Sequence, residues 1–170
     1  MAARSLAAQP VHWLGLAAVA VAALVADQLT KHIVASQVQL DDEVKVVGPF
    51  SIHHVQNSGI AFGLFASATA IVIVLTVLAV AWMLGYFARS GARHPLLPVA
   101  VGLVIGGSVS NLADRVRLGH VIDFLDFRYW PAFNLADTFI VVGVAVLLGA
   151  LVAADRRPRR SRLGNPATRS

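Results

Sequence analysis

Long apolar runs alternate with short polar clusters along this chain. A membrane helix needs about 20 consecutive residues that are mostly apolar. Four runs approach that length, and we predict that they form membrane-spanning helices over about residues 11–31, 66–88, 96–114 and 136–154. The pattern therefore predicts an all-α membrane protein with four transmembrane helices, built as a single domain over residues 1–155.

The first run has a second interpretation as a signal peptide. Arg4 precedes it, and the alanine-rich stretch at residues 22–26 resembles a cleavage site. However, the run leads directly into the polar segment 27–31 rather than into a soluble domain. We therefore favour a helix that remains in the protein.

The connection between the first and second helices, residues 32–65, is too long for a simple turn. Residues 44–47 and 50–55 are short segments of high β-propensity, and Gly48-Pro49 lies between them as a turn signal. We predict a small extramembrane β-rich segment between helices 1 and 2. Next to a bilayer, such a segment could cover a site or guide an extended chain.

Composition supports the membrane assignment and excludes several kinds of chemistry. The 170 residues are 57% hydrophobic and 14% charged, whereas about 25% charged residues is usual in soluble domains. The chain has no cysteine, which excludes disulfides, thiolate catalysis and cysteine metal sites. Its six histidines show no HxxxH or HExxH spacing, so we predict no metal and no cofactor.

The basic residues indicate orientation rather than nucleic-acid binding. Six of the fourteen lie in the C-terminal tail 156–170, which we predict to be disordered, cytoplasmic and in contact with anionic lipid. With the N-terminus inside, inner segments hold nine Lys and Arg, and eight of the nine acids lie at outer ends. This count predicts that both termini are cytoplasmic, although without the tail it becomes three against five.

Topology then places five polar clusters on the outer side of the membrane. They are residues 27–31, 57–62, 111–115, 121–124 and 133–137. Ionisable groups at membrane depth are costly and are usually functional. One composite site at the outer face would explain all five clusters.

Asp123 and Asp137 are the candidates for chemistry in that site. Alternation over residues 121–127 predicts an extended segment in which Asp123 and Asp126 face opposite ways, with Asp126 as a solvated surface acid. Two close carboxylates share one proton, so that one serves as acid and the other as base, as in aspartic proteases. Such a pair activates water against an amide carbonyl. The alternative is structural, because Asp137 follows the predicted N-cap Asn134 by three residues.

The remaining clusters also have structural alternatives. Asp27 and Lys31 have the i, i+4 spacing of a helix-end salt bridge, and Asn57-Ser58-Gly59 is typical of a turn. Asn111, Asp114 and Arg115 share a helix face, where Asp114 could neutralise Arg115 in a helix-end network. Alternatively, Arg115 could orient a catalytic carboxylate or contact a lipid phosphate. Before them, Gly106-Gly107-Ser108 permits close helix packing.

In this order, the five clusters resemble those of the lipoprotein signal peptidase (signal peptidase II) family, over about residues 24–140. That family shows DxxxK, NxGxAF, GGAxGNxxDR, VVDF and FNxAD. The chain departs from the pattern at Ser110, where the family has glycine, and at Ile122, which replaces the second valine. Its connection between Asp123 and Asp137 is also shorter than in the family.

The resemblance implies an aspartyl endopeptidase of the bacterial cytoplasmic (inner) membrane. It would cleave prolipoproteins just before a diacylglyceryl-modified cysteine, work as a monomer among membrane lipids without a cofactor, and be inhibited by globomycin-type antibiotics. The catalytic pair would be Asp123 and Asp137. Substrate-binding or supporting positions would be Asp27, Lys31, Asn57, Gly59, Asn111, Asp114, Arg115, Asn134 and Ala136.

Two other functions are compatible with intramembrane acids. A proton-coupled transporter predicts acids near the middle of the helices and internal repeats, and the sequence shows neither feature. A non-catalytic membrane scaffold predicts that each outer acid can be replaced with little effect.

Overall fold

The computed structural model describes residues 7–58, 69–91 and 94–155. Its four helices are α1 (Pro10–Gln37), α2 (Thr69–Ser90), α3 (Leu97–Leu118) and α4 (Leu135–Asp155). Within the described residues, α1, α2 and α3 are long and apolar enough to cross a membrane, and α4 carries a shorter apolar stretch, Leu135–Ala150. All four helices thus form where the apolar runs predicted them, but α1 and α3 continue past their predicted ends at residues 31 and 114, to Gln37 and Leu118. Gly59 and the tail 156–170 lie outside the described residues.

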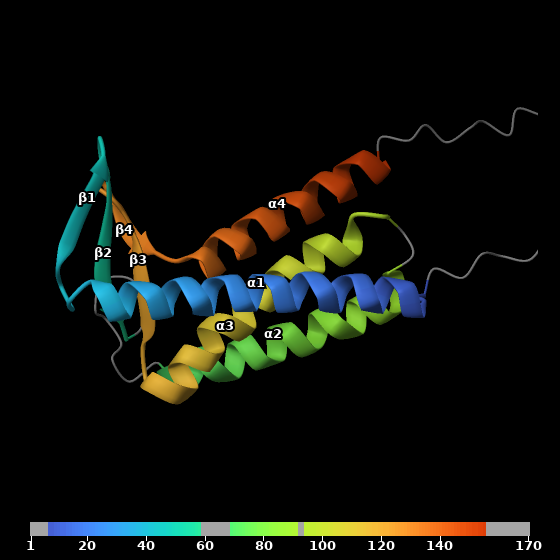
Figure 1. Ribbon diagram of the computed structural model, residues 1–170. Coiled ribbons are helices and arrows are strands. Elements are labelled where there is room, and N and C mark those ends of the chain that lie inside the picture. The colour runs from blue at the N-terminus through green and yellow to red at the C-terminus, as the bar shows by residue number, and fades with distance from the viewer. Residues whose placement is uncertain (1–6, 59–68, 92–93, 156–170) are drawn as a thin grey trace, which may run out of the picture.

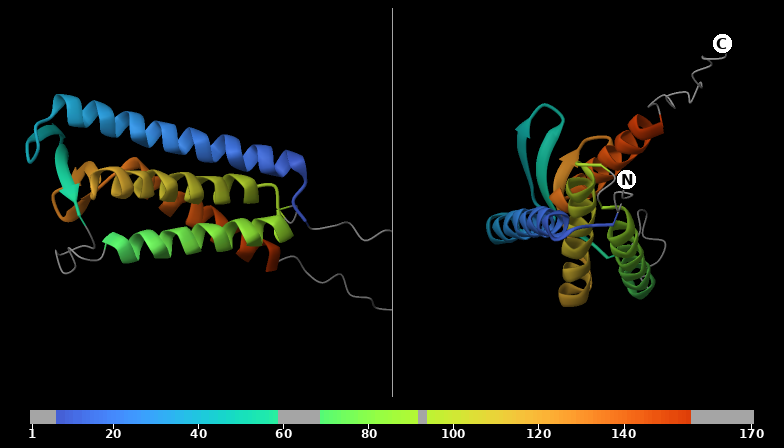
Figure 2. Two further views of the ribbon diagram at one scale, coloured as in Figure 1. Left: turned by 90° about the horizontal axis from the view of Figure 1, so that it is seen from below. Right: turned by 90° about the vertical axis from the view of Figure 1, so that its right-hand side faces the viewer.

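Helix α3 is the central helix of the bundle, with α1 and α4 packed closely against it (Figures 1 and 2). Glycines permit this approach. A Cβ atom on Gly106 would lie 2.5 Å from the Ala20 carbonyl oxygen of α1, and one on Gly107 would overlap the Ala136 carbonyl oxygen of α4. The predicted close packing at residues 106–107 is therefore confirmed. At these glycines the backbone of α3 lies directly against α1 and α4. Polar groups on the C-terminal half of α3 therefore lie beside both α1 and the start of α4.

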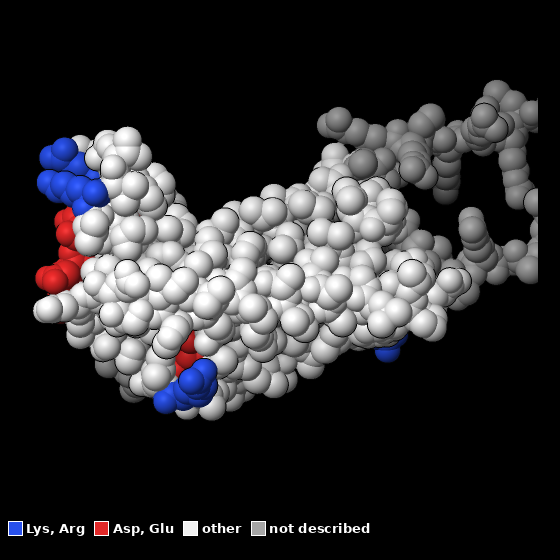
Figure 3. Space-filling model, viewed as in Figure 1, with Lys and Arg blue, Asp and Glu red and all other residues white. Residues whose placement is uncertain are grey.

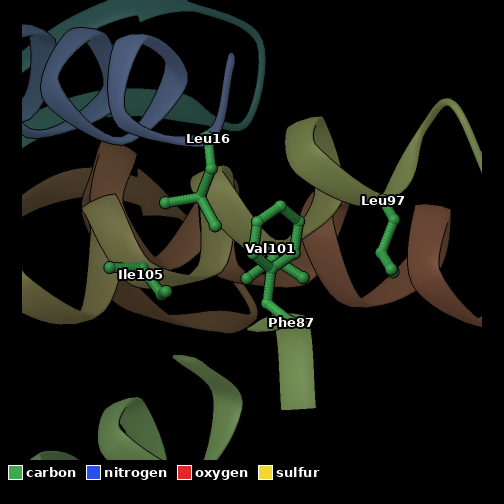
Figure 4. Packing of buried hydrophobic residues seen from close by; sticks show 5 residues of the cluster. All are labelled: Leu16, Phe87, Leu97, Val101 and Ile105. Atoms are coloured by element: carbon green, nitrogen blue, oxygen red, sulfur yellow. The ribbon is translucent and has the colours of Figure 1, made fainter. Parts of the chain in front are cut away.

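A compact apolar cluster lies at the end of the bundle where α1 and α3 begin and α2 ends. Phe87 of α2 is fully buried against α1 and α3, and its ring meets Trp13 edge-on with the centroids 5.0 Å apart. The other members are Leu16, Leu97, Val101 and Ile105 (Figure 4). This cluster joins α2 to the bundle and contains no ionisable group.

An antiparallel sheet of four strands crosses the other end of the bundle (Figure 1). Its strands are β1 (Glu43–Val47), β2 (Phe50–Asn57), β3 (Val121–Phe127) and β4 (Trp130–Phe133), paired in that order. The β-rich segment between helices 1 and 2 is therefore confirmed as β1 and β2. The sheet also contains β3 and β4 from the connection between α3 and α4. The predicted fold class did not include these two strands.

Strand register gives the sheet two different faces. Lys45, Ser51 and Asp126 are aligned across β1, β2 and β3, and the neighbouring row contains Ile52, Leu125 and Phe133. Residues aligned across strands share a face, so one row is polar and the next is apolar. On the side of the molecule shown in Figure 3, charged residues gather mainly at the end that carries this sheet.

Candidate active site

The polar clusters meet where the sheet joins the helices. Asp27 and Lys31 come from the C-terminal half of α1, Asn111 and Asp114 from that of α3, and Asn57 from the end of β2. Asp123 lies on β3, and Asn134, Ala136 and Asp137 lie at the start of α4. Residues from all five predicted polar clusters thus lie together, contributed by five separate parts of the chain.

Each oxygen of the two candidate carboxylates accepts one hydrogen bond. Asp123 accepts from the Asn134 side-chain amide at 2.7 Å and from the Asn57 amide at 2.9 Å. Asp137 accepts from the Asn111 amide at 2.8 Å and from the Asn134 backbone N–H at 3.3 Å. Asp123 is 2% exposed, and Asp126, three residues along the strand, pairs with His53 on the other face. The predicted opposite orientation of the two acids is confirmed, but Asp126 is half-buried against His53 rather than a freely solvated surface acid.

Asn134 links the two acids. Its side chain is completely buried, and its Oδ1 accepts the Asp137 backbone N–H at 2.9 Å. Its Nδ2 donates to Asp123, while its own backbone N–H donates to Asp137. The exchange with Asp137 is the reciprocal pattern of a capping box. The predicted N-cap is therefore confirmed, and it does not compete with a catalytic role because the same residue orients both carboxylates.

Lys31 is buried at the centre of a second set of contacts. Its ammonium lies 2.7 Å from Asp27, 2.8 Å from Asp114 and 2.9 Å from the Asn111 side-chain oxygen, so all three donors are used. Asp27 also accepts the Ala136 backbone N–H at 2.8 Å. The predicted Asp27–Lys31 pair therefore exists, but it lies inside the protein and connects α1, α3 and α4 rather than only bridging two turns of one helix.

Asp114 and Arg115 do not form the pair that adjacency suggested. Asp114 forms its salt bridge with Lys31 and accepts a hydrogen bond from Gln28 at 2.8 Å. Arg115 donates from Nη1 to the Asn111 carbonyl oxygen at 3.4 Å, and its buried Nε has no partner among the described residues. Adjacent helical residues point in directions about 100° apart, so the two side chains diverge.

The surroundings of Asp123 change its proton affinity. Burial raises the pKa of Asp123 from 3.8 to about 6, the hydrogen bond from Asn57 opposes this rise, and the negative charge of Asp137 adds to it. A carboxyl group with a pKa near 6 can hold a proton close to neutral pH and release it during a reaction. The two acids therefore interact electrostatically, as a general acid–base pair must.

An apolar cavity of about 310 Å³ lies beside Asp137, between β4 and α4. Its lining consists of Trp130, Phe133, Asp137, Thr138, Val141 and Val142. A larger polar cavity of about 470 Å³ is lined by Lys45, Ser51, Asp126, Arg128 and their neighbours, and contains neither candidate acid. The smaller cavity is the one that concerns the candidate pair, because it brings apolar surface to the carboxylate of Asp137. Within the described residues, no group of three or more His, Asp or Glu could hold a metal ion.

Two residues in the site were not among the predicted site residues. Gln28 donates to Asp114 and to the Ser110 hydroxyl, and that hydroxyl donates to Asp27 at 2.7 Å. The only signal at Ser110 was that it stands where the family motif has glycine, and this did not predict a contact with Asp27. Gln28 lies inside the polar cluster 27–31, but an uncharged amide gave no separate signal.

The chain is similar to several known proteins. A family model described as signal peptidase (SPase) II matches residues 19–153. A lipoprotein signal peptidase of Symbiobacterium thermophilum is 43% identical over 143 residues, which cover 81% of this chain and 94% of that protein. One from Moorella thermoacetica is 41% identical over 130 residues, covering 76% and 87% respectively.

Two solved structures, both described as bacterial membrane enzymes determined by the in meso method, have a similar fold. One, at 2.3 Å resolution, has a TM-score of 0.80 with 24% identity, covering 96% of this chain and 100% of that one. The other, at 1.9 Å resolution, has a TM-score of 0.77 with 25% identity, covering 88% and 98%. The arrangement of helices and sheet is thus shared with membrane enzymes.

Proposed function

The chain belongs to the signal peptidase II family, and we propose that it is an aspartic endopeptidase that removes signal peptides from prolipoproteins inside the membrane. The cut falls just before a cysteine that carries a diacylglyceryl group. The observation that supports this proposal is the pair Asp123 and Asp137, both buried and both hydrogen-bonded to Asn134 at the junction of sheet and helices.

The pair acts as acid and base while sharing one proton. Asp123, with its pKa of about 6, carries the proton, and Asp137 is the base. As a water oxygen attacks the scissile carbonyl carbon, Asp137 takes a proton from that water and Asp123 protonates the carbonyl oxygen. The tetrahedral intermediate then collapses: one of its hydroxyl groups returns a proton to Asp123 as the carbonyl re-forms, the C–N bond breaks, and the leaving nitrogen takes the proton held by Asp137. Each proton moves between groups of the pair and the substrate.

The supporting residues fix this pair and receive the substrate. Asn57, Asn111 and Asn134 supply side-chain N–H groups to the two carboxylates. The buried Nε of Arg115 has no partner among the described residues and is suited to a carbonyl oxygen of the bound chain. The apolar cavity beside Asp137 accepts a hydrophobic part of the substrate next to the scissile bond.

We place the protein in the bacterial cytoplasmic membrane as a monomer, with both termini in the cytoplasm and the acids at the outer face. In Figures 1 and 2, both ends of the described chain lie at the end of the bundle away from the sheet. This arrangement and the positive-inside count support the orientation. Globomycin-type antibiotics are expected to inhibit the enzyme. The acids lie at one end of the helices rather than at mid-span, which does not favour a proton-coupled transporter.

A cleavage assay with purified protein tests the proposal. A synthetic prolipoprotein peptide, with and without the diacylglyceryl group on its cysteine, is incubated with the wild type and with Asp123→Asn and Asp137→Asn. Asp126→Asn is the matched control, because it removes an acid from the same strand but from the other face. We expect cleavage of the lipidated peptide only, lost in both active-site variants and kept in the control. Wild-type turnover in folded Asp123→Asn or Asp137→Asn would refute the assignment.

A further inference from the structure

The position of Asp137 depends on how the first turn of α4 is held. The first N–H groups of a helix have no partner within the helix. Here the Asp137 N–H is bound by Asn134 Oδ1 from the same turn, but the Ala136 N–H is bound by Asp27 of α1 at 2.8 Å. The carboxylate of Asp27 is therefore the point at which α1 fixes the helix that carries Asp137.

Lys31 alone does not fix Asp27. Its ammonium is shared among Asp27, Asp114 and Asn111 at similar distances of 2.7, 2.8 and 2.9 Å. The Ser110 hydroxyl of α3 supplies a second, separate contact, donating to Asp27 Oδ2 at 2.7 Å. Ser110 is completely buried, so no water competes for this bond.

Gln28 sets the direction of the Ser110 hydroxyl. The Gln28 Nε2 group can only donate, and it lies 3.0 Å from the Ser110 oxygen and 2.8 Å from Asp114 Oδ1. An ionised Asp27 can only accept, so the single hydroxyl proton of Ser110 must point toward Asp27. A serine within a helix otherwise tends to bond to a carbonyl of its preceding turn. Gln28 therefore favours the one hydroxyl orientation that supports Asp27.

We infer that Ser110 and Gln28 are positioning residues for catalysis, which act through Asp27 and Ala136 to hold Asp137 against its partner. This inference rests on the proposed function, because it assumes that Asp137 is catalytic. Neither side chain touches Asp123 or Asp137 among the contacts of the described residues. Their effect on the reaction is thus entirely through the placement of α4.

Kinetics of Ser110→Ala on the lipidated peptide test this inference, with Ser108→Ala as the matched control. Ser108 lies two residues earlier on α3, and its side chain forms no hydrogen bond with the described residues. Ser110→Ala should lower kcat about tenfold and leave KM nearly unchanged, because small displacements of a catalytic group act on the chemical step. Ser110→Thr, which keeps the hydroxyl, should retain most of the wild-type kcat. Gln28→Met should lower kcat less than Ser110→Ala does.

Amide hydrogen exchange provides a measurement that needs no substrate. In Ser110→Ala, peptides that cover the start of α4 should exchange at least about fivefold faster than in the wild type or Ser108→Ala. Wild-type kcat and wild-type exchange in Ser110→Ala would overturn the inference and leave the proposed function intact. An inactive wild type would remove the proposed function, and the exchange result alone would then decide whether Ser110 holds α4. If Ser110→Ala does not fold, Gln28→Met decides by the same two measurements.

Discussion

Replacement of Lys31 by methionine should destabilise the protein strongly, because it leaves two acids in the interior without their cation. Lys31 is 2% exposed, Asp27 is 0% exposed and Asp114 is 4% exposed. Methionine keeps the apolar stem of the side chain but removes three charge-assisted contacts of 2.7–2.9 Å. The charge of the cluster formed by these three residues changes from −1 to −2.

The size of the effect follows from what the two acids retain. Removing one partner of a buried ion pair typically costs about 3–5 kcal/mol. Asp27 keeps its bonds from Ser110 and Ala136, and Asp114 keeps the bond from Gln28. We therefore expect a loss near the lower limit, about 3 kcal/mol, which corresponds to a fall in Tm of roughly 6–12 °C for a chain of this size.

A double-mutant cycle with Asp114→Asn identifies the cause of the loss. Combining the two changes restores the cluster charge to −1, so Asp114→Asn should cost about 1–2 kcal/mol less in the Lys31→Met background than in the wild type. Unfolding is followed by circular dichroism in mixed detergent micelles. A loss below about 1 kcal/mol for Lys31→Met, or effects that add within about 0.5 kcal/mol, would show that buried charge does not connect these helices.

Three further outcomes are expected at the active site and in the helix packing. The kcat/KM of the wild type should fall as pH rises through about 6, because the free enzyme loses the shared proton at the raised pKa of Asp123. A kcat/KM that rises through this pH would contradict the assignment of Asp123 as the acid. Asn57→Ala should move this fall in kcat/KM to higher pH, because the substitution removes a hydrogen bond that favours ionised Asp123. An unchanged or lower midpoint would show that this hydrogen bond does not lower the pKa of Asp123. Gly107→Ala should lower the free energy of unfolding by about 1–3 kcal/mol and reduce activity, because the added methyl group forces α4 away from α3. Gly149→Ala is the control and should not destabilise the fold, because a Cβ atom at that position meets no atom within 4 Å. Equal stability of the two variants would argue against close packing at residue 107.

The location of the site could be predicted from the sequence because membrane topology constrains it. Apolar runs must cross the bilayer, so polar clusters at alternate ends of those runs gather on one side. The i, i+4 spacing likewise predicted the contact between Asp27 and Lys31. Both rules depend on distances along the chain that the helix itself fixes.

Contacts between elements were less predictable. Asp114 pairs with Lys31 of α1 only because glycines bring α3 close, and no local spacing encodes that distance. The same limit applies to β4, because nothing in the local sequence predicted a strand over residues 130–133. Trp130 and Pro131 begin an edge strand, in which the missing N–H of proline can be tolerated. Residues 130–133 form a strand because they pair with β3, which lies in the same connection between α3 and α4.

The buried cation also determines the chemistry of an uncharged neighbour. An asparagine amide can present either its oxygen or its NH₂ group to a carboxylate, and the two choices have opposite consequences. Lys31 donates to Asn111 Oδ1 at 2.9 Å and the Asn134 amide donates to the same oxygen at 3.1 Å, so this oxygen is committed to two donors. The Asn111 NH₂ group must then face Asp137, to which it donates at 2.8 Å. A salt bridge that looks purely structural in the sequence therefore sets which atom of Asn111 meets the carboxylate of Asp137, the base in the proposed mechanism, so support and proposed catalysis depend on the same contacts.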